Sequence, residues 1–157
     1  MKPSFYVLSL EDSDMDFEII SEQLINAGFN LNISRAQSEK EFMSLILKRR
    51  FDFILADNNL PQFSAFEALK IRNKHCPEVP FICVTGSIGE NMARELFRLG
   101  AVDYVLKDNP EKLPIAIKKA MDEAKEKSAR RRAEYALKEN ENRFNKVAED
   151  IRDSSFH

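Results

Sequence analysis

Five short apolar runs alternate with segments of helical periodicity along most of this chain. The runs occupy residues 5–10, 31–34, 51–56, 79–84 and 101–106. Helical patterns follow them over residues 14–27, 38–48, 66–74 and 91–99, and a last helix opens at Pro110. Crossovers of about ten residues or more between consecutive strands imply a parallel sheet, which helices cover on both faces. Continuous apolar strands are typical of such double burial. The sequence therefore predicts a doubly wound α/β fold, although the spacing leaves the strand order open.

The segment after Pro110 has a different composition. Half of the residues from Glu111 to Asp150 are charged and none is glycine, whereas all four glycines of the chain come earlier. This shift indicates the end of a compact domain and the start of a long solvated helix. We therefore predict one domain at residues 1–124 and a helical linker at residues 125–157.

Charge and cysteine usage exclude several classes of protein. A net charge of −2 and a pI near 5.8 provide no overall attraction to nucleic acid or anionic lipid. Arg130, Arg131 and Arg132 stand among glutamates and lysines, which favours a solvated helix face. Cys76 and Cys83 have no second pair to complete a zinc site, so two reduced thiols are expected. The apolar run at 5–10 is too short for a signal peptide or a membrane span. We expect a cytoplasmic segment without nucleic-acid or membrane contacts.

Polar residues follow four of the five predicted strands. Glu11 and Asp12 come after the first strand, Asp57 after the third, Thr85 ends the fourth and Lys107 follows the fifth. In open α/β sheets, ligands bind beyond the carboxyl ends of the strands. If the sheet brings these ends together, one cleft holds three carboxylates, a hydroxyl and an ammonium.

The chemistry suited to such a cleft is phosphoryl transfer. Three close carboxylates repel one another unless a cation lies among them, and oxygen ligands favour a hard ion such as Mg²⁺. Lys107 and the metal would neutralise charge on the moving group, Thr85 would donate a hydrogen bond to it, and a carboxylate would be the nucleophile. Asp16 is expected on the first helix, away from the metal.

Four segments resemble the receiver domain of response regulators, the CheY-like phospho-acceptor of two-component signalling. They are residues 8–12 (LSLED), 57–61 (DNNLP), 84–86 (VTG) and 103–107 (DYVLK), and the likeness runs from about residue 5 to residue 124. The resemblance implies a flavodoxin-like (βα)5 sheet with the strand order 2-1-3-4-5. It also implies that a histidine kinase or a phosphotransfer protein is the partner that supplies the phosphoryl group.

The resemblance also assigns roles to individual residues. Asp57 would be the phospho-acceptor, and Glu11, Asp12, Asp57 and the backbone carbonyl of Asn59 would hold Mg²⁺. Such a domain catalyses only its own phosphoryl transfer and dephosphorylation, so we do not expect a turnover enzyme.

The remaining implied roles concern the phosphoryl group and the switch. Thr85 and Lys107 would contact the phosphoryl oxygens, and Tyr104 would turn inward with Thr85 on activation. The chain departs from the family pattern at Asp108, which stands where a proline usually follows the lysine, and at Glu11, where the family often has Asp.

Three other functions compete with this interpretation. A flavodoxin-like FMN binder needs a first loop of Ser, Thr and Gly amides, whereas this loop carries Glu11, Asp12, Asp14 and Asp16. A haloacid-dehalogenase-type phosphatase needs Asp-x-Asp after the first strand, with an aspartate as nucleophile. In this chain the expected nucleophile, Asp57, follows the third strand, and Asn59 stands two residues after it. A pseudo-receiver has the same fold and binds proteins without phosphorylation, and the complete set of site residues argues against it.

The C-terminal segment carries a heptad-like pattern. Its seam positions follow steps of four and three: Ala133, Leu137, Asn140, Phe144, Val147 and Ile151. An upstream seam slips register between Ser128 and Ala133. The pattern indicates either a weak coiled coil or a single solvated helix.

Residues 139–144 also resemble the entry helix of a PAS domain. The resemblance suggests that the linker leads into a truncated PAS domain, and that the parent protein also carries a histidine kinase or another output module. We expect a homodimer that forms through the helix 4–strand 5–helix 5 face and the C-terminal helix.

Overall fold

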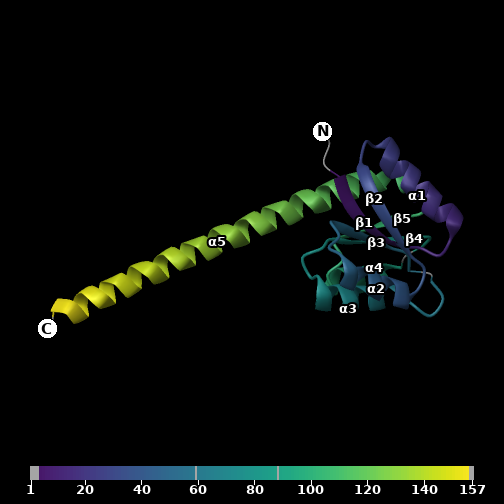
Figure 1. Ribbon diagram of the computed structural model, residues 1–157. Helices are drawn as coiled ribbons and strands as arrows, with labels where there is room; N and C mark the ends of the chain where they lie inside the picture. Colours follow the sequence, from purple (N-terminus) through teal and green to yellow (C-terminus); the bar gives the residue numbers. More distant parts are fainter. Residues whose placement is uncertain (1–3, 59, 88, 156–157) are drawn as a thin grey trace. The chain divides into compact units, whose positions relative to one another are not determined.

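The computed structural model describes residues 4–58, 60–87 and 89–155, and side chains through residue 139. The strands are β1 (Ser4–Leu10), β2 (Asn30–Ala36), β3 (Phe53–Ala56), β4 (Phe81–Thr85) and β5 (Asp103–Leu106). The helices are α1 (Asp14–Asn26), α2 (Glu39–Lys48), α3 (Ala65–His75), α4 (Glu90–Arg98), the short 3₁₀ helix η1 (Pro110–Lys112) and α5 (Leu113–Ser155). All strand pairs are parallel, and the order is β2-β1-β3-β4-β5 (Figure 1). The predicted fold and strand order are confirmed.

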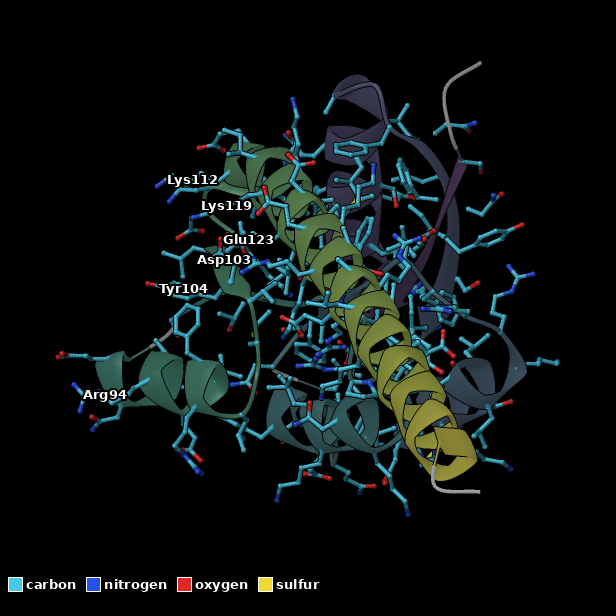
Figure 2. All side chains as sticks on the ribbon, turned by 90° about the vertical axis from the view of Figure 1, so that its left-hand side faces the viewer. Arg94, Asp103, Tyr104, Lys112, Lys119 and Glu123 are labelled. Carbon is cyan, nitrogen blue, oxygen red and sulfur yellow. The ribbon has the colours of Figure 1, made fainter. Side chains whose placement is uncertain are left out.

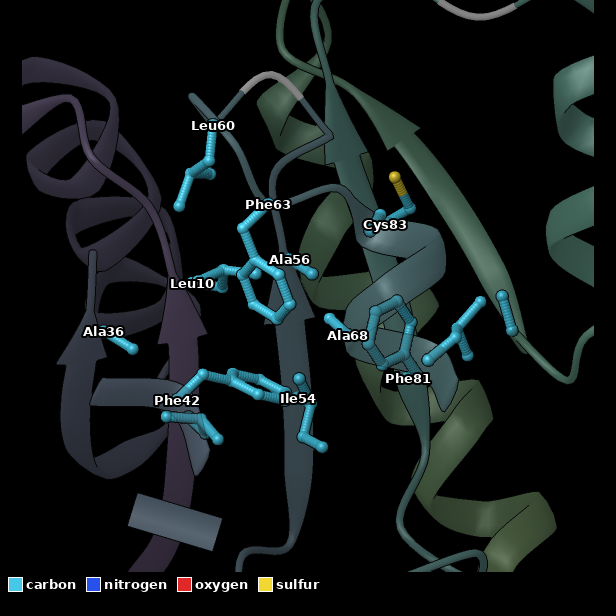
Figure 3. Close-up of a cluster of buried hydrophobic side chains, with 14 of the residues drawn as sticks. Leu10, Ala36, Phe42, Ile54, Ala56, Leu60, Phe63, Ala68, Phe81 and Cys83 are labelled. Carbon is cyan, nitrogen blue, oxygen red and sulfur yellow. The ribbon is translucent and has the colours of Figure 1, made fainter. Parts of the chain in front are cut away.

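Two hydrophobic cores lie on opposite faces of the sheet. On one face, α2, α3 and α4 cover Ile54 and Phe81, and the fully buried Phe42 of α2 lies beside Ile54 (Figure 3). On the other face, α1 and the start of α5 cover Phe53 and Leu55. Successive residues of a strand point to opposite faces, so β3 needs apolar residues at every position. This double burial is the reason why the strands are continuous apolar runs.

Serine side chains set the starts of three helices. Ser13, Ser38 and Ser64 each accept a hydrogen bond from the backbone N–H three residues later. At the start of α2, the Glu41 N–H lies 3.2 Å from Ser38 Oγ, and the Glu41 carboxylate accepts a hydrogen bond from the Gln37 N–H at 2.9 Å. Ser64 starts α3 at Ala65, one residue before the predicted position.

Four strand boundaries differ from the prediction by two residues, namely the starts of β3, β4 and β5 and the end of β2. β3 begins at Phe53 rather than residue 51, because Asp52 is bound to Tyr6 through its backbone and its carboxylate. β4 begins at Phe81, directly after Pro80, which has no N–H for the sheet. β2 continues to Ala36 rather than ending at residue 34, so that Arg35 lies within the strand at the carboxyl edge of the sheet.

The chain divides into two compact units, Met1–Asp122 and Glu123–His157. α5 begins in the first unit and continues as helix through residues 128–133, where the sequence predicted a register slip. In the second unit, the described side chains from residue 125 onward are exposed, Leu137 at 61%. The seam positions Asn140, Phe144, Val147 and Ile151 lie outside the described side chains. Among the described residues, no helix is long and apolar enough to cross a membrane.

Candidate phospho-acceptor site

The carboxyl edge of the sheet brings the predicted strand-end residues together. Backbone hydrogen bonds continue the sheet by one residue beyond the strands: Asp57 N–H donates to Leu10 at 2.9 Å, and Lys107 N–H donates to Thr85 at 2.8 Å. Glu11 N–H likewise donates to Ala36 at 3.0 Å. These bonds hold the first residue after each strand in register. The site side chains therefore start from a rigid backbone rather than from a free loop.

Three carboxylates form an acidic cluster at this edge. Glu11, Asp12 and Asp57 each place a carboxylate oxygen within 4.8 Å of the others. Glu11 and Asp57 are buried, and Asp12 is exposed to solvent. Within the described part of the chain, Glu11 Oε1 is buried and accepts no hydrogen bond. Lys107 Nζ lies 3.0 Å from this oxygen as an ion pair. A buried carboxylate oxygen that accepts no hydrogen bond, beside two further carboxylates, fits a hard cation such as Mg²⁺. Asn59, the fourth predicted ligand, lies outside the described residues.

Lys107 crosses the site and meets three carboxylates. Its Nζ donates to Asp16 Oδ2 at 2.6 Å and to Asp57 Oδ2 at 3.0 Å. The same Nζ lies 3.0 Å from Glu11 Oε1. Burial by itself lowers the pKa of Lys107, but the three carboxylates more than offset this and raise the pKa above its usual value. Lys107 is therefore a permanent cation beside Asp57.

The carboxyl group of Glu11 has a perturbed pKa. Burial is the main cause and the neighbouring Asp57 adds to it, so that the pKa rises from 4.5 to about 7 even though Lys107 opposes the shift. In the metal-free protein, ionised Glu11 is therefore a destabilising charge.

This pKa shift predicts how the stability of the metal-free protein changes with pH. The pKa of Glu11 is higher in the folded state than in the unfolded state. Glu11 therefore contributes fully to the free energy of unfolding below pH 4.5, and this contribution is lost as the pH rises through about 7. Glu11→Gln should remove that loss and stabilise the protein at pH 8 by on the order of 2 kcal/mol. Urea unfolding at pH 5 and pH 8, with a chelator present, measures the effect. A variant that is less stable than the wild type at pH 8 would contradict it.

Thr85 and Tyr104, the two residues expected to move on activation, make their contacts with residues outside the acidic cluster. Thr85 is fully buried, and its hydroxyl donates to the Ser87 carbonyl at 3.1 Å. Tyr104 lies beside α4, and its ring packs edge-on against Phe97 with the ring centroids 6.0 Å apart (Figure 2). Both side chains thus have partners that they would leave if they moved toward Asp57.

Two residues contribute contacts that the sequence analysis did not assign. Arg35 Nε donates to the Glu11 carbonyl at 2.8 Å, its Nη1 lies 2.7 Å from Asp14, and its guanidinium stacks over Phe17. Arg35 thus holds the segment of residues 11–14 against the end of β2. Its position at the end of the second strand could have revealed it, had that strand been extended to residue 36. The prediction that Asp16 lies on the first helix is confirmed, but its contact with Lys107 joins residues 91 positions apart, and no pattern of neighbouring residues indicates it.

A parallel sheet of this strand order, with an acidic cluster, a hydroxyl and a lysine at its carboxyl edge, defines the class of two-component receivers. The family model of the response regulator receiver domain matches residues 7–118, and the chain belongs to this family. Receiver domains are signalling domains.

The chain is also similar to individual known proteins. The chain is 29% identical over 111 residues to a probable cyclic di-GMP phosphodiesterase of Vibrio cholerae, covering 69% of this chain and 24% of that protein. It is 26% identical to the transcriptional regulatory protein ZraR of Escherichia coli O157:H7, covering 61% of this chain and 22% of ZraR. A CheY-like receiver domain protein from Methanospirillum hungatei JF-1 superimposes with a TM-score of 0.70 at 25% identity, covering 80% of this chain and 99% of that one. The chain thus spans about a quarter of the length of the first curated relatives.

Proposed function

We propose that the chain accepts a phosphoryl group on Asp57 from a histidine kinase or a phosphotransfer protein, in the presence of Mg²⁺. The observation that carries the proposal is the buried Asp57 carboxylate, which lies 3.0 Å from the Lys107 ammonium and within 4.8 Å of carboxylate oxygens of Glu11 and Asp12. A nucleophile, a fixed cation and a metal-binding cluster are the parts that phosphoryl transfer requires.

In the transfer step, a carboxylate oxygen of Asp57 forms a bond to phosphorus, and the bond from phosphorus to the donor breaks. With acetyl phosphate as donor, the electron pair leaves with acetate, and no proton is needed. With phosphohistidine, the pair returns to the imidazole nitrogen, which then takes up a proton. Lys107 donates to the oxygens of the group in transit, and Thr85 becomes a second donor once its hydroxyl leaves Ser87.

Glu11, Asp12 and Asp57 would hold Mg²⁺, with the backbone carbonyl of Asn59 as the further ligand that the family pattern supplies. A bound Mg²⁺ neutralises the negative charge that accumulates on the phosphoryl oxygens. Arg35 supports this role indirectly, because it fixes the carbonyl of Glu11 and the side chain of Asp14.

The test is incubation with acetyl phosphate and Mg²⁺, followed by intact mass spectrometry. A mass gain that requires Asp57 supports the proposal. The competing function is a pseudo-receiver, which would fold in the same way, bind its protein partner and show no mass gain.

We further propose that the signal leaves through α4, β5 and α5 to an output or sensory module, with a PAS domain as the candidate, in the cytoplasm. Arg94, Asp103 and Lys119 give this face charges of both signs, while Phe97 and Val102 expose apolar surface at 47% and 39%. Figure 2 shows Tyr104 at the same edge as Arg94. Mixed charge with apolar area suits pairing with a second copy of the chain.

Phosphorylation should therefore change the dimer. An acyl phosphate adds roughly −1.5 to −2 charges. Lys107 already contacts Asp57 at 3.0 Å, so the added charge mainly draws Thr85 toward Asp57, which opens space for Tyr104. We expect beryllofluoride, a phosphoryl mimic, to shift the dimerisation constant or the distance between spin labels at position 137. Sedimentation and pulsed spin-label measurements, with Asp57→Asn as control, test this. If neither quantity changes in the wild type, the helix is a passive tether.

A further inference from the structure

Asp16 binds Lys107 but is not one of the three residues of the acidic cluster. It lies in the first turn of α1, where its backbone N–H donates to Ser13 Oγ at 3.3 Å. Its carboxylate is 2.6 Å from Lys107 Nζ, closer than the Asp57 oxygen at 3.0 Å. The side chains of Asp16 and Lys107 are 31% and 19% exposed, so water screens the pair only in part. Asp16 thereby connects α1 to the residue that follows β5.

The number of N–H donors on the Lys107 ammonium suggests what its contact with Asp16 does. Lys107 has three N–H donors, of which one goes to Asp16 and one to Asp57, and its Nζ also lies 3.0 Å from Glu11 Oε1. A phosphoryl group on Asp57 needs the donor that now serves Asp57 itself. The donor to Asp16 can stay where it is, so Asp16 keeps Nζ in place while the contact with Asp57 changes.

Among the residues that the structure describes, those lining this side of Lys107 apart from Asp16 are apolar. A small recess beside Asp16 and Lys107 is lined mainly by the apolar residues Ile19, Ile20, Val84, Val105 and Leu113. Without Asp16, an ammonium could not satisfy a donor there and would gain more from turning toward solvent.

We propose that Asp16 is a positioning residue that holds the Lys107 ammonium beside Asp57 for phosphoryl transfer. The role in transfer rests on the proposed function above, whereas the hold on Lys107 does not. A positioning role predicts that removal of Asp16 slows phosphorylation, whereas its charge alone predicts that removal speeds it. Asp16 adds a fourth carboxylate to a site that receives an anionic donor, so its removal should by charge alone help acetyl phosphate to enter. The sign of the rate change therefore separates the two roles.

The kinetic test compares Asp16→Ala with Glu18→Ala, a matched control that removes an exposed carboxylate two residues further along α1. At saturating Mg²⁺ and acetyl phosphate, Asp16→Ala should lower the maximal rate of phosphorylation about tenfold, because the cation is no longer oriented. Glu18→Ala should leave the rate unchanged, and Asp16→Glu should restore part of it. A rate for Asp16→Ala equal to or above that of the wild type would overturn the proposal.

A second measurement does not depend on phosphorylation. In the metal-free protein, the ¹⁵Nζ signal of the Lys107 ammonium should be protected from exchange with water in the wild type, Glu18→Ala and Asp16→Glu. It should lose that protection in Asp16→Ala. An unchanged signal overturns the positioning role even if Asp57 is phosphorylated. If the wild type takes up no phosphoryl group while the Lys107 signal still depends on Asp16, the proposed function fails and the hold of Asp16 on Lys107 stands.

Discussion

Asp57→Asn should abolish the mass gain of about 80 Da that the wild-type chain shows with acetyl phosphate and Mg²⁺. The carboxylate oxygen is the nucleophile in the proposed step, and a neutral amide cannot replace it. Asn retains the shape of Asp, and its amide oxygen can still accept from Lys107. The loss is therefore expected in a folded protein, which a dispersed proton–nitrogen NMR spectrum would verify.

The matched control is Asp14→Asn. Asp14 lies on the same edge of the sheet but is exposed and pairs with Arg35 rather than with Lys107. That variant should still gain the mass, and peptide mapping should place the group on Asp57 in both Asp14→Asn and the wild type. Retention of the gain in Asp57→Asn, on any other residue, would show that the acceptor has been misassigned.

Asp12→Ala should weaken Mg²⁺ binding far more than Asp16→Ala does. Asp12 shares the acidic cluster with Glu11 and Asp57, whereas Asp16 is committed to Lys107. Loss of a supporting residue around a metal costs roughly 10–100-fold in affinity, so loss of a ligand should cost at least about 30-fold. Asp16→Ala removes only a more distant charge and should change the affinity by less than about threefold. Isothermal titration with MgCl₂ measures both.

The titration belongs at pH 8, where Glu11, with its pKa of about 7, is largely ionised in the metal-free protein. Mg²⁺ must otherwise displace a proton from Glu11, and the apparent affinity of every variant falls. Equal losses for Asp12→Ala and Asp16→Ala would mean that the metal site has been misplaced.

Local features of the sequence were sufficient to predict which segments form the strands and helices of this fold. The apolar run before Asp57 and the serine before each of three helices act within a few residues, through burial of adjacent side chains and through capping. Strand ends were less certain, because they depend on contacts made elsewhere. β3 starts late since Asp52 binds Tyr6, which is 46 residues away. The strand order came from the likeness to receivers, since the spacing of strands along the chain does not specify which strands pair.

The sequence by itself determined that Glu11, Asp57 and Lys107 directly follow three of the strands, and therefore that they lie at one edge of the sheet. That follows from the parallel sheet, in which every carboxyl end lies on the same side. Only the tertiary structure decided the partners of those side chains. Lys107 reaches Asp16 across 91 residues, Arg35 reaches the Glu11 carbonyl across 24, and Thr85 donates to Ser87. Such pairings depend on strand register and on where α1 lies against the sheet, and no pattern of neighbouring residues encodes either of them.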